Sequence, residues 1–211
     1  PATTLSAVSY KDMFYGCTNL TTAPSILPAT TLAVDCYRHM FYGCTSLVHG
    51  PSSIGTSATT MASSCCTLMF YGCISLTQAP ELPATTSAIY CYDSMFNGCT
   101  NLTTAPELPA TTLGYHCYNS MFKGCTSLTS APLILPATTL TASCYSFMFS
   151  GCTSLTSAPE LPATTLAGNC YYGMFQGCTS LTQAPELPAT TLAGGCYQGM
   201  FRGCTGLTQA P

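Results

Sequence analysis

The segment Phe122-Lys-Gly-Cys-Thr-Ser-Leu-Thr129 decides the fold, because close copies of it return at a regular interval along the chain. A Met precedes the Phe in each copy. The Met-Phe pairs begin at Met13, Met40, Met69, Met95, Met121, Met148, Met174 and Met200. The intervals between them are 27, 29, 26, 26, 27, 26 and 26 residues. Self-similarity at such a period predicts a solenoid, in which each unit buries its apolar face only against its neighbours.

Each unit divides into two halves with different patterns. In residues 166–175 the apolar side chains fall at i, i+4, i+5, i+8 and i+9, the spacing of one helical face, so a short helix or a pair of 3₁₀ turns is expected. Thr164 or Thr165 is placed to cap its start, and Gly177 stands where a left-handed C-terminal residue belongs. Residues 180–185 alternate and end at Pro, as a very short strand does.

Charge is scarce in this chain, at 5% of 211 residues with a net charge of -3, whereas 47% of residues are hydrophobic. Disordered chains show the opposite balance, so a folded array is expected. No basic patch could neutralise a row of phosphates, which argues against nucleic acid as a partner. No apolar run reaches the roughly 18 residues of a membrane span. The first residues, Pro-Ala-Thr-Thr, contain neither an initiator Met nor a signal peptide, so we expect part of a longer chain.

Of the 16 cysteines, 15 form two columns, and Cys66 belongs to neither. One column follows each Met by four residues, and the other precedes it by four. The second column comprises Cys36, Cys65, Cys91, Cys117, Cys144, Cys170 and Cys196, and Ser9 takes its place in the first unit. Zinc is not expected, because no CxxC pair occurs and the three His share no column. A ladder of equivalent thiols also lacks the single activated Cys that thiol catalysis needs.

Two interpretations of the cysteine columns stay open. They are buried reduced thiols that pack as small hydrophobes, or they are disulfides, which such a cysteine density in an extracellular setting favours. Eight residues of helix would separate Cys170 from Cys178 by about 12 Å, beyond the limit of about 7 Å between bridgeable Cα atoms. Bridges would then join each Gly-Cys to the next unit, and Ser9 fits because the first unit has no predecessor. The candidate pairs are Cys17–Cys36, Cys44–Cys65, Cys73–Cys91, Cys99–Cys117, Cys125–Cys144, Cys152–Cys170 and Cys178–Cys196. Neither interpretation accounts for Cys66.

The motif Phe-x-Gly-Cys-Thr-Ser-Leu-Thr of residues 122–129 resembles the BspA-like leucine-rich repeats of bacterial surface proteins. Met-Phe in place of Ala-Phe is similar to the related Met-Phe-type surface-lipoprotein repeats. The resemblance covers essentially the whole chain and departs from the family in the Leu-Pro-Ala-Thr-Thr-Leu-Ala-x-x-Cys-Tyr part, where the familiar units are shorter and usually lack the second Cys. It implies a secreted or surface-anchored protein used for adhesion and partner binding.

We therefore predict an α/β repeat fold over residues 1–211 as a single domain. It is a right-handed leucine-rich-repeat solenoid of eight units of about 26 residues, with short parallel strands on one side and short helices or 3₁₀ turns on the other. The predicted function is a non-enzymatic, extracellular or cell-surface module that binds a protein or glycan ligand. The alternative is a structural segment of an extracellular fibre, in which further copies of the chain stack end to end. No catalytic residue, cofactor or metal site is expected, because catalysis needs unlike groups that converge.

Three repeated surfaces are candidates for binding. The outward face of the predicted helix differs most between copies, and its candidate residues are Arg38, Asp93, Asn119 and Gln198. Stacked carboxylates in the Ala-Pro-Glu-Leu-Pro turns, at Glu81, Glu107, Glu160 and Glu186, bind calcium or form a solvated edge. The Thr-Thr pairs form a regular array that binds ice or glycans, or they cap helices and satisfy backbone groups.

Overall fold

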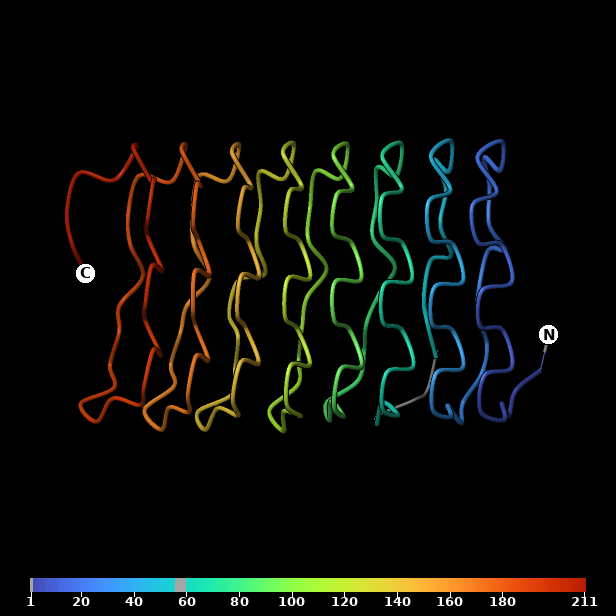
Figure 1. Ribbon diagram of the computed structural model, residues 1–211, viewed down its shortest axis with the longest axis horizontal. Helices are drawn as coiled ribbons and strands as arrows, with labels where there is room; N and C mark the ends of the chain where they lie inside the picture. The colour runs from blue at the N-terminus through green and yellow to red at the C-terminus, as the bar shows by residue number, and fades with distance from the viewer. Residues whose placement is uncertain (1, 56–59) are drawn as a thin grey trace.

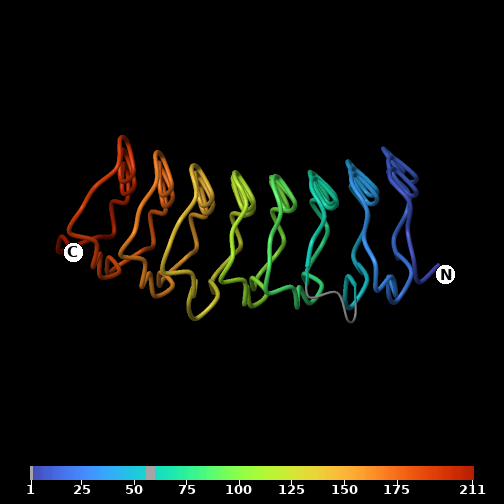
Figure 2. The same cartoon turned by 90° about the horizontal axis from the view of Figure 1, so that it is seen from below.

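The computed structural model describes residues 2–55 and 60–211. Its turns stack side by side along one long axis, with the two termini at opposite ends (Figure 1). Tightly folded segments gather along one edge of the stack, and more open loops lie along the other (Figure 2). The described residues contain no helix and no strand, and regular pairing there is limited to isolated parallel bridges such as Thr104 with Ser130 and Ile134 with Glu160.

The folded edge is built from a segment that we call the turn ribbon. It comprises residues 8–17, 35–44, 64–73, 90–99, 116–125, 143–152, 169–178 and 195–204. In every turn ribbon three residues spaced four apart have positive φ, as Asn169, Gly173 and Gly177 do at 56°, 57° and 75°. Such left-handed residues reverse the chain after each short turn, so the segment folds back and forth in one plane.

Backbone hydrogen bonds of the turn ribbon alternate between two kinds of partner. The N–H of Tyr10 donates to the carbonyl of Cys36 in the next turn at 2.8 Å, whereas the N–H of Lys11 donates three residues back to Val8 at 3.3 Å. Five bonds of the first kind join each pair of consecutive turn ribbons, at 2.7 to 3.3 Å. All of them run in the same direction, from an N–H of one turn to a carbonyl of the following turn.

Residues 166–175 form no helix, which was one of the two forms expected there. They form separate turns closed by hydrogen bonds to the residue three positions back, such as that from Met174 N–H to the Tyr171 carbonyl at 3.2 Å, and their apolar spacing has another cause. Left-handed residues recur every four positions in the turn ribbon, so side chains four residues apart point in the same direction. Side chains four residues apart also point in nearly the same direction in a helix, which explains the similar spacing. The residues expected to be buried on one face of a helix are accordingly buried here as well: Cys170, Tyr171, Met174 and Phe175. The left-handed conformation expected of Gly177 is confirmed, but it lies within the ribbon rather than after a helix.

The strand half and the Thr-Thr pairs also differ from expectation. Parallel pairing between turns is present, but as isolated bridges rather than strands. Thr165 caps no helix and instead forms bridges with Thr139 and Thr191, and Thr164 donates its N–H to the carbonyl of Thr138 at 3.1 Å. These are backbone bonds; the expected bond from a Thr hydroxyl to a backbone group is seen at Thr30, whose Oγ1 donates to the carbonyl of Thr3 at 3.2 Å.

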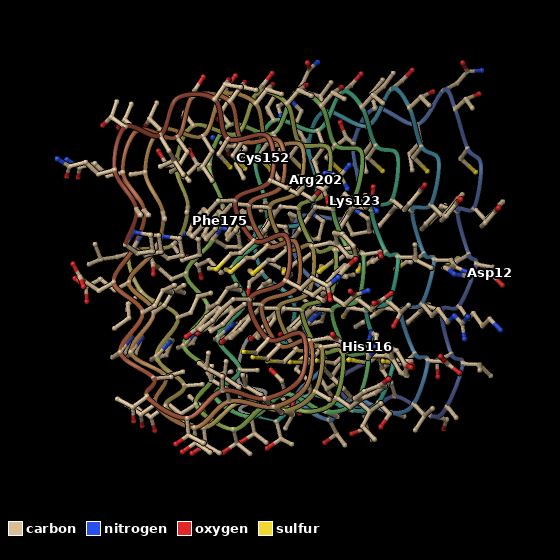
Figure 3. All side chains as sticks on the ribbon, turned by 60° about the vertical axis from the view of Figure 1, so that its left-hand side comes forward. Asp12, His116, Lys123, Cys152, Phe175 and Arg202 are labelled. Carbon is tan, nitrogen blue, oxygen red and sulfur yellow. The ribbon has the colours of Figure 1, made fainter. Side chains whose placement is uncertain are left out.

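The core consists of identical side chains stacked turn upon turn. Phe14, Phe41, Phe70, Phe96, Phe122, Phe149, Phe175 and Phe201 form one continuous stack with ring centroids 5.3 to 5.7 Å apart. A tyrosine column runs beside it and is interrupted at Cys66, which is fully buried at the tyrosine position. Sulfur atoms also lie in rows along the stack (Figure 3). Of the tyrosines that follow Cys, Tyr37, Tyr92, Tyr118, Tyr145 and Tyr171 are buried, and Tyr197 in the last turn is partly buried.

We predict that Gly124→Ala lowers the free energy of unfolding by about 1–2 kcal/mol, because an L side chain is strained at positive φ. The φ of Gly124 is 73°, and an added Cβ would meet backbone atoms of Gly98 only at ordinary distances of 3.9 Å. Urea unfolding followed by circular dichroism measures the change. Gly168→Ala is the matched control: its φ is not positive and its Cβ would have room, so it should be neutral or slightly stabilising. Equal losses in the two variants would contradict this account of the turn ribbon.

Candidate functional site

Charges are divided between the two edges of the solenoid. All four cations and all three aspartates lie in the turn ribbons: Lys11, Arg38, Lys123 and Arg202 with Asp12, Asp35 and Asp93. All four glutamates lie on the loops of the opposite edge. The formal charges are +1 for the ribbon edge (4 − 3) and −4 for the loop edge, which together give the net charge of -3. The loop edge is therefore the acidic side of the molecule.

An open groove of about 650 Å³ lies on the loop edge between two consecutive Ala-Pro-Glu-Leu-Pro loops. Its walls include Pro83 and Leu82 from one loop and Pro106 and Pro109 from the next. Glu81 and Glu107 also line it, and both are exposed. Proline fixes its own backbone φ, so these walls are stiff as well as apolar. The groove thus combines a rigid apolar floor with two carboxylates.

The same arrangement recurs between two later turns. A groove of about 380 Å³ is lined by Pro159, Pro162, Pro185 and Pro188, with Glu160 and Glu186 at equivalent positions. At residues 48–52, where the standard turn sequence is replaced, the corresponding hollow has no glutamate and is lined by His49, Ser25 and Ser52 instead. Groove chemistry therefore follows the loop sequence, whereas the turn ribbon keeps its form in every copy.

The four predicted surface residues share one column of the turn ribbons. Gln198 is exposed, whereas Arg38, Asp93 and Asn119 are half-buried. The Asn119 amide donates to Asp93 Oδ1 at 2.7 Å, and Arg38 lies 3.4 Å from Asp35. Burial raises the pKa of Asp93, and the hydrogen bond from Asn119 opposes that rise. The structure thus brings Asp93 and Asn119 together and leaves Gln198 apart from them, at the far end of the column.

Thiols of the Gly-Cys column are held by hydrogen bonds between turns. Cys125 Sγ donates to the carbonyl of Phe96 at 3.1 Å, and the equivalent thiols from Cys44 to Cys204 do the same at 2.9 to 3.1 Å. Burial raises the pKa of Cys73 to about 12, and the proximity of Cys44 adds to the rise. The buried column is therefore held in the unreactive thiol form. Cys17 is the one exposed cysteine among the 16.

The structure forms none of the seven predicted bridges. All 16 cysteines are free thiols, including Cys17 and Cys36, Cys44 and Cys65, Cys73 and Cys91, Cys99 and Cys117, Cys125 and Cys144, Cys152 and Cys170, and Cys178 and Cys196. Each column lies against its own copies instead, as the electrostatic effects of Cys65 on Cys36 and of Cys44 on Cys73 indicate. Disulfide formation within these pairs stays a prediction, and counting the free thiols, described below, tests it.

Two further observations bear on the site. Across residues 2–55 and 60–211, no group of three or more His, Cys, Asp or Glu side chains converges where it could hold a metal ion, and the spaced glutamates form no such group. In the same part of the chain, no helix is long and apolar enough to cross a membrane. The sequence analysis does not predict the groove, although the repeated Pro on both sides of Glu-Leu is a signal for it.

Comparison with known proteins identifies the family. The BspA type leucine rich repeat region, in six copies, matches residues 7–182 and 115–210. The chain therefore belongs to the family of BspA-type leucine-rich-repeat proteins, as the Phe-x-Gly-Cys-Thr-Ser-Leu-Thr motif predicted. Among curated protein sequences no match to the chain is found.

Three solved structures are similar to the chain. A leucine-rich-repeat protein of T. pallidum is 21% identical with a TM-score of 0.48, and the match covers 81% of this chain and 71% of that one. A leucine-rich-repeat protein of Bacteroides ovatus is 19% identical with a TM-score of 0.39, over 78% and 45% of the two chains. A leucine-rich cell surface protein of Faecalibacterium prausnitzii is 20% identical with a TM-score of 0.40, over 93% and 61%. The chain thus spans less than two thirds of the last two proteins.

Counting thiols distinguishes the two interpretations of the cysteine columns. After unfolding without reductant, alkylation and mass spectrometry should give 16 modified cysteines if the structure's thiols persist. The seven predicted bridges use 14 cysteines and would leave two, Cys66 and Cys204. In the native protein we expect rapid alkylation of Cys17 alone, since burial withholds the other thiols from the reagent. Rapid native modification of the Gly-Cys column would contradict the packing described above.

Proposed function

We propose that this protein is a non-enzymatic, extracellular or cell-surface module that binds a partner protein along the loop edge of its solenoid. The observation that carries the proposal is the repetition of a proline-walled, glutamate-bearing groove at two places on that edge. Solenoids present extended surfaces of this kind to their ligands, and the family of the chain supports a role in protein binding.

The chemistry of the groove favours an extended segment with Lys or Arg side chains. Such a side chain lays its aliphatic stem on apolar surface and keeps its charged head at the polar rim. Pro83, Leu82 and Pro106 supply that surface, and Glu81 and Glu107 supply the opposite charge. All four Lys and Arg of this chain lie on the ribbon edge, so none of them competes for these carboxylates. No aromatic residue lines either groove, so neither offers a face on which a sugar ring could stack.

A second candidate function is a structural segment of an extracellular fibre. The observation that favours it is the regular stacking of the turns, which are joined along one axis by a ladder of backbone hydrogen bonds in a single direction and by stacked Phe rings.

Binding of two synthetic peptides tests the first function. An extended peptide of alternating Lys and Val should bind the 211-residue protein, and one of alternating Glu and Val should not, as read by fluorescence polarisation. Exposed ion pairs contribute about 0.2–1 kcal/mol each, so the double variant Glu81→Gln/Glu107→Gln should bind the basic peptide roughly twofold to thirtyfold more weakly at that groove. Added salt should weaken binding by the native protein.

Asp12→Asn/Asp35→Asn is the matched control, because it also removes two carboxylates but on the ribbon edge. Its affinity for the basic peptide should equal that of the native protein. Equal affinity in the groove variant and the native protein, or binding of the acidic peptide, would argue against the loop edge as the partner site.

A further inference from the structure

We infer that the ribbon edge carries a second binding site, which takes the uncharged pyranose ring of a glycan. This site goes beyond the protein-binding role proposed for the loop edge and lies on the opposite side of the solenoid. It is built by two consecutive turns near the middle of the stack (green in Figure 2). Its side chains are those of Tyr90, Asp93, Tyr115, His116 and Asn119.

These five side chains bring unlike chemical groups together, in contrast to the columns of identical residues in the core. Phenol, imidazole, carboxylate and amide groups meet across two turns, and a binding site needs such a convergence. Tyr90 and His116 are the first left-handed residues of their ribbons. The other six ribbons carry no aromatic ring at that position, which is held by Val8, Asp35, Ser64, Ser143, Asn169 and Gly195.

The aromatic part of the site is an exposed group of three rings. The rings of Tyr90 and Tyr115 meet edge to face, with centroids 5.7 Å apart and planes at 84°. The His116 ring lies 4.1 Å from that of Tyr115 and 5.1 Å from that of Tyr90. Tyr115 is 43% exposed, and Ile89 beside it in sequence is 48% exposed. The phenylalanines of the core cover one another in a parallel stack, whereas this arrangement leaves ring surface open to a ligand.

The polar part of the site lies next to these rings. The amide of Asn119 donates to Asp93 Oδ1 at 2.7 Å, and both side chains are half-buried. Asp93 acts electrostatically on both Tyr90 and His116, which places its carboxylate beside the rings. Burial lowers the pKa of His116, and Asp93 opposes that change. The imidazole is therefore neutral at pH 7, and one of its nitrogens donates while the other accepts.

The mixture of donors and acceptors selects the ligand. An amide carries two donors and an acceptor, and within residues 2–55 and 60–211 the side chain of Asn119 makes no hydrogen bond other than that to Asp93. A sugar hydroxyl both donates and accepts, so it pairs with the carboxylate and with the amide. A Lys or Arg side chain only donates, and a quaternary ammonium does neither, so each would leave polar groups of the site unpaired. The apolar C–H face of the sugar ring then packs on a tyrosine.

Backbone bonds of the turn ribbons hold the site in place. The N–H of Tyr90 donates to the carbonyl of Tyr115 at 3.0 Å, and the N–H of Ser94 donates to the carbonyl of Asn119 at 2.8 Å. Each of these bonds joins the two turns that supply the side chains. Little backbone ordering is therefore left for the ligand to impose, which favours binding by a small molecule.

Saturation-transfer NMR with four methyl glycosides tests the inference, the sugars being glucose, galactose, mannose and N-acetylglucosamine. We expect at least one of them to bind the 211-residue protein, with transfer to the protons of its ring. Tyr115→Ala removes the packing surface and should weaken binding roughly twofold to tenfold, and Asn119→Ala should do so to a similar extent. Tyr115→Phe keeps the ring and should bind more tightly than Tyr115→Ala.

Tyr15→Ala is the matched control, because it removes a tyrosine that is 54% exposed on the ribbon edge but belongs to another turn. Its affinity for the sugar should equal that of the native protein. Weakening confined to Tyr115→Ala and Asn119→Ala, with every variant folded by circular dichroism, would support the site. Absence of transfer to all four sugars, or native affinity in Tyr115→Ala, would overturn it. Binding of choline in place of the sugars would also overturn it and would assign the rings to a cation.

Discussion

The hydrogen-bond ladder between turn ribbons is the constraint on which the rest of the structure depends. Five N–H groups of each ribbon need five carbonyls of the next at one spacing, so every copy must keep the same length and the same left-handed positions. A buried backbone group without a partner costs about 1–3 kcal/mol, which makes a missing or extra ribbon residue expensive. The varying intervals between copies are therefore taken up in the loops. The identical Phe and Cys columns follow, because consecutive ribbons in register place equivalent side chains directly upon one another.

Much of this architecture could be predicted from the sequence, and its exact local form could not. The regular period predicted the solenoid, and the Cys-Tyr and Met-Phe pairs predicted which side chains are buried. The helix was wrong because a chain that reverses every four residues places side chains almost as a helix does. Another signal was present: Asn169, Gly173 and Gly177 are four apart, and Asn and Gly are the residues that most readily adopt positive φ. Val8 and Leu68 also have positive φ, but neither is a residue type that commonly adopts it, so the sequence carries no signal at these positions.

The candidate site was harder to predict because its walls belong to different turns. The spacing of Glu81 and Glu107 shows a repeat but does not show that prolines of two loops enclose a groove between them. The disulfide scheme assumes a helical separation of the two cysteine columns, whereas each column lies in its own row along the stack. The two edges therefore differ in how much their sequences can change. Backbone hydrogen bonds fix the length and conformation of the turn ribbons, whereas the loops can vary in length and in the side chains that line the grooves.

The direction of the ladder also determines how the molecule responds to pulling. Its bonds lie along the axis of the stack, so tension between the two ends stretches them lengthwise. The turns are joined in series, and the junction with the weakest bonds therefore opens first while the others remain closed. Each released turn of about 26 residues lengthens the chain by roughly 3.3–3.6 Å per residue. We therefore expect a stack of such turns to lengthen in steps under load.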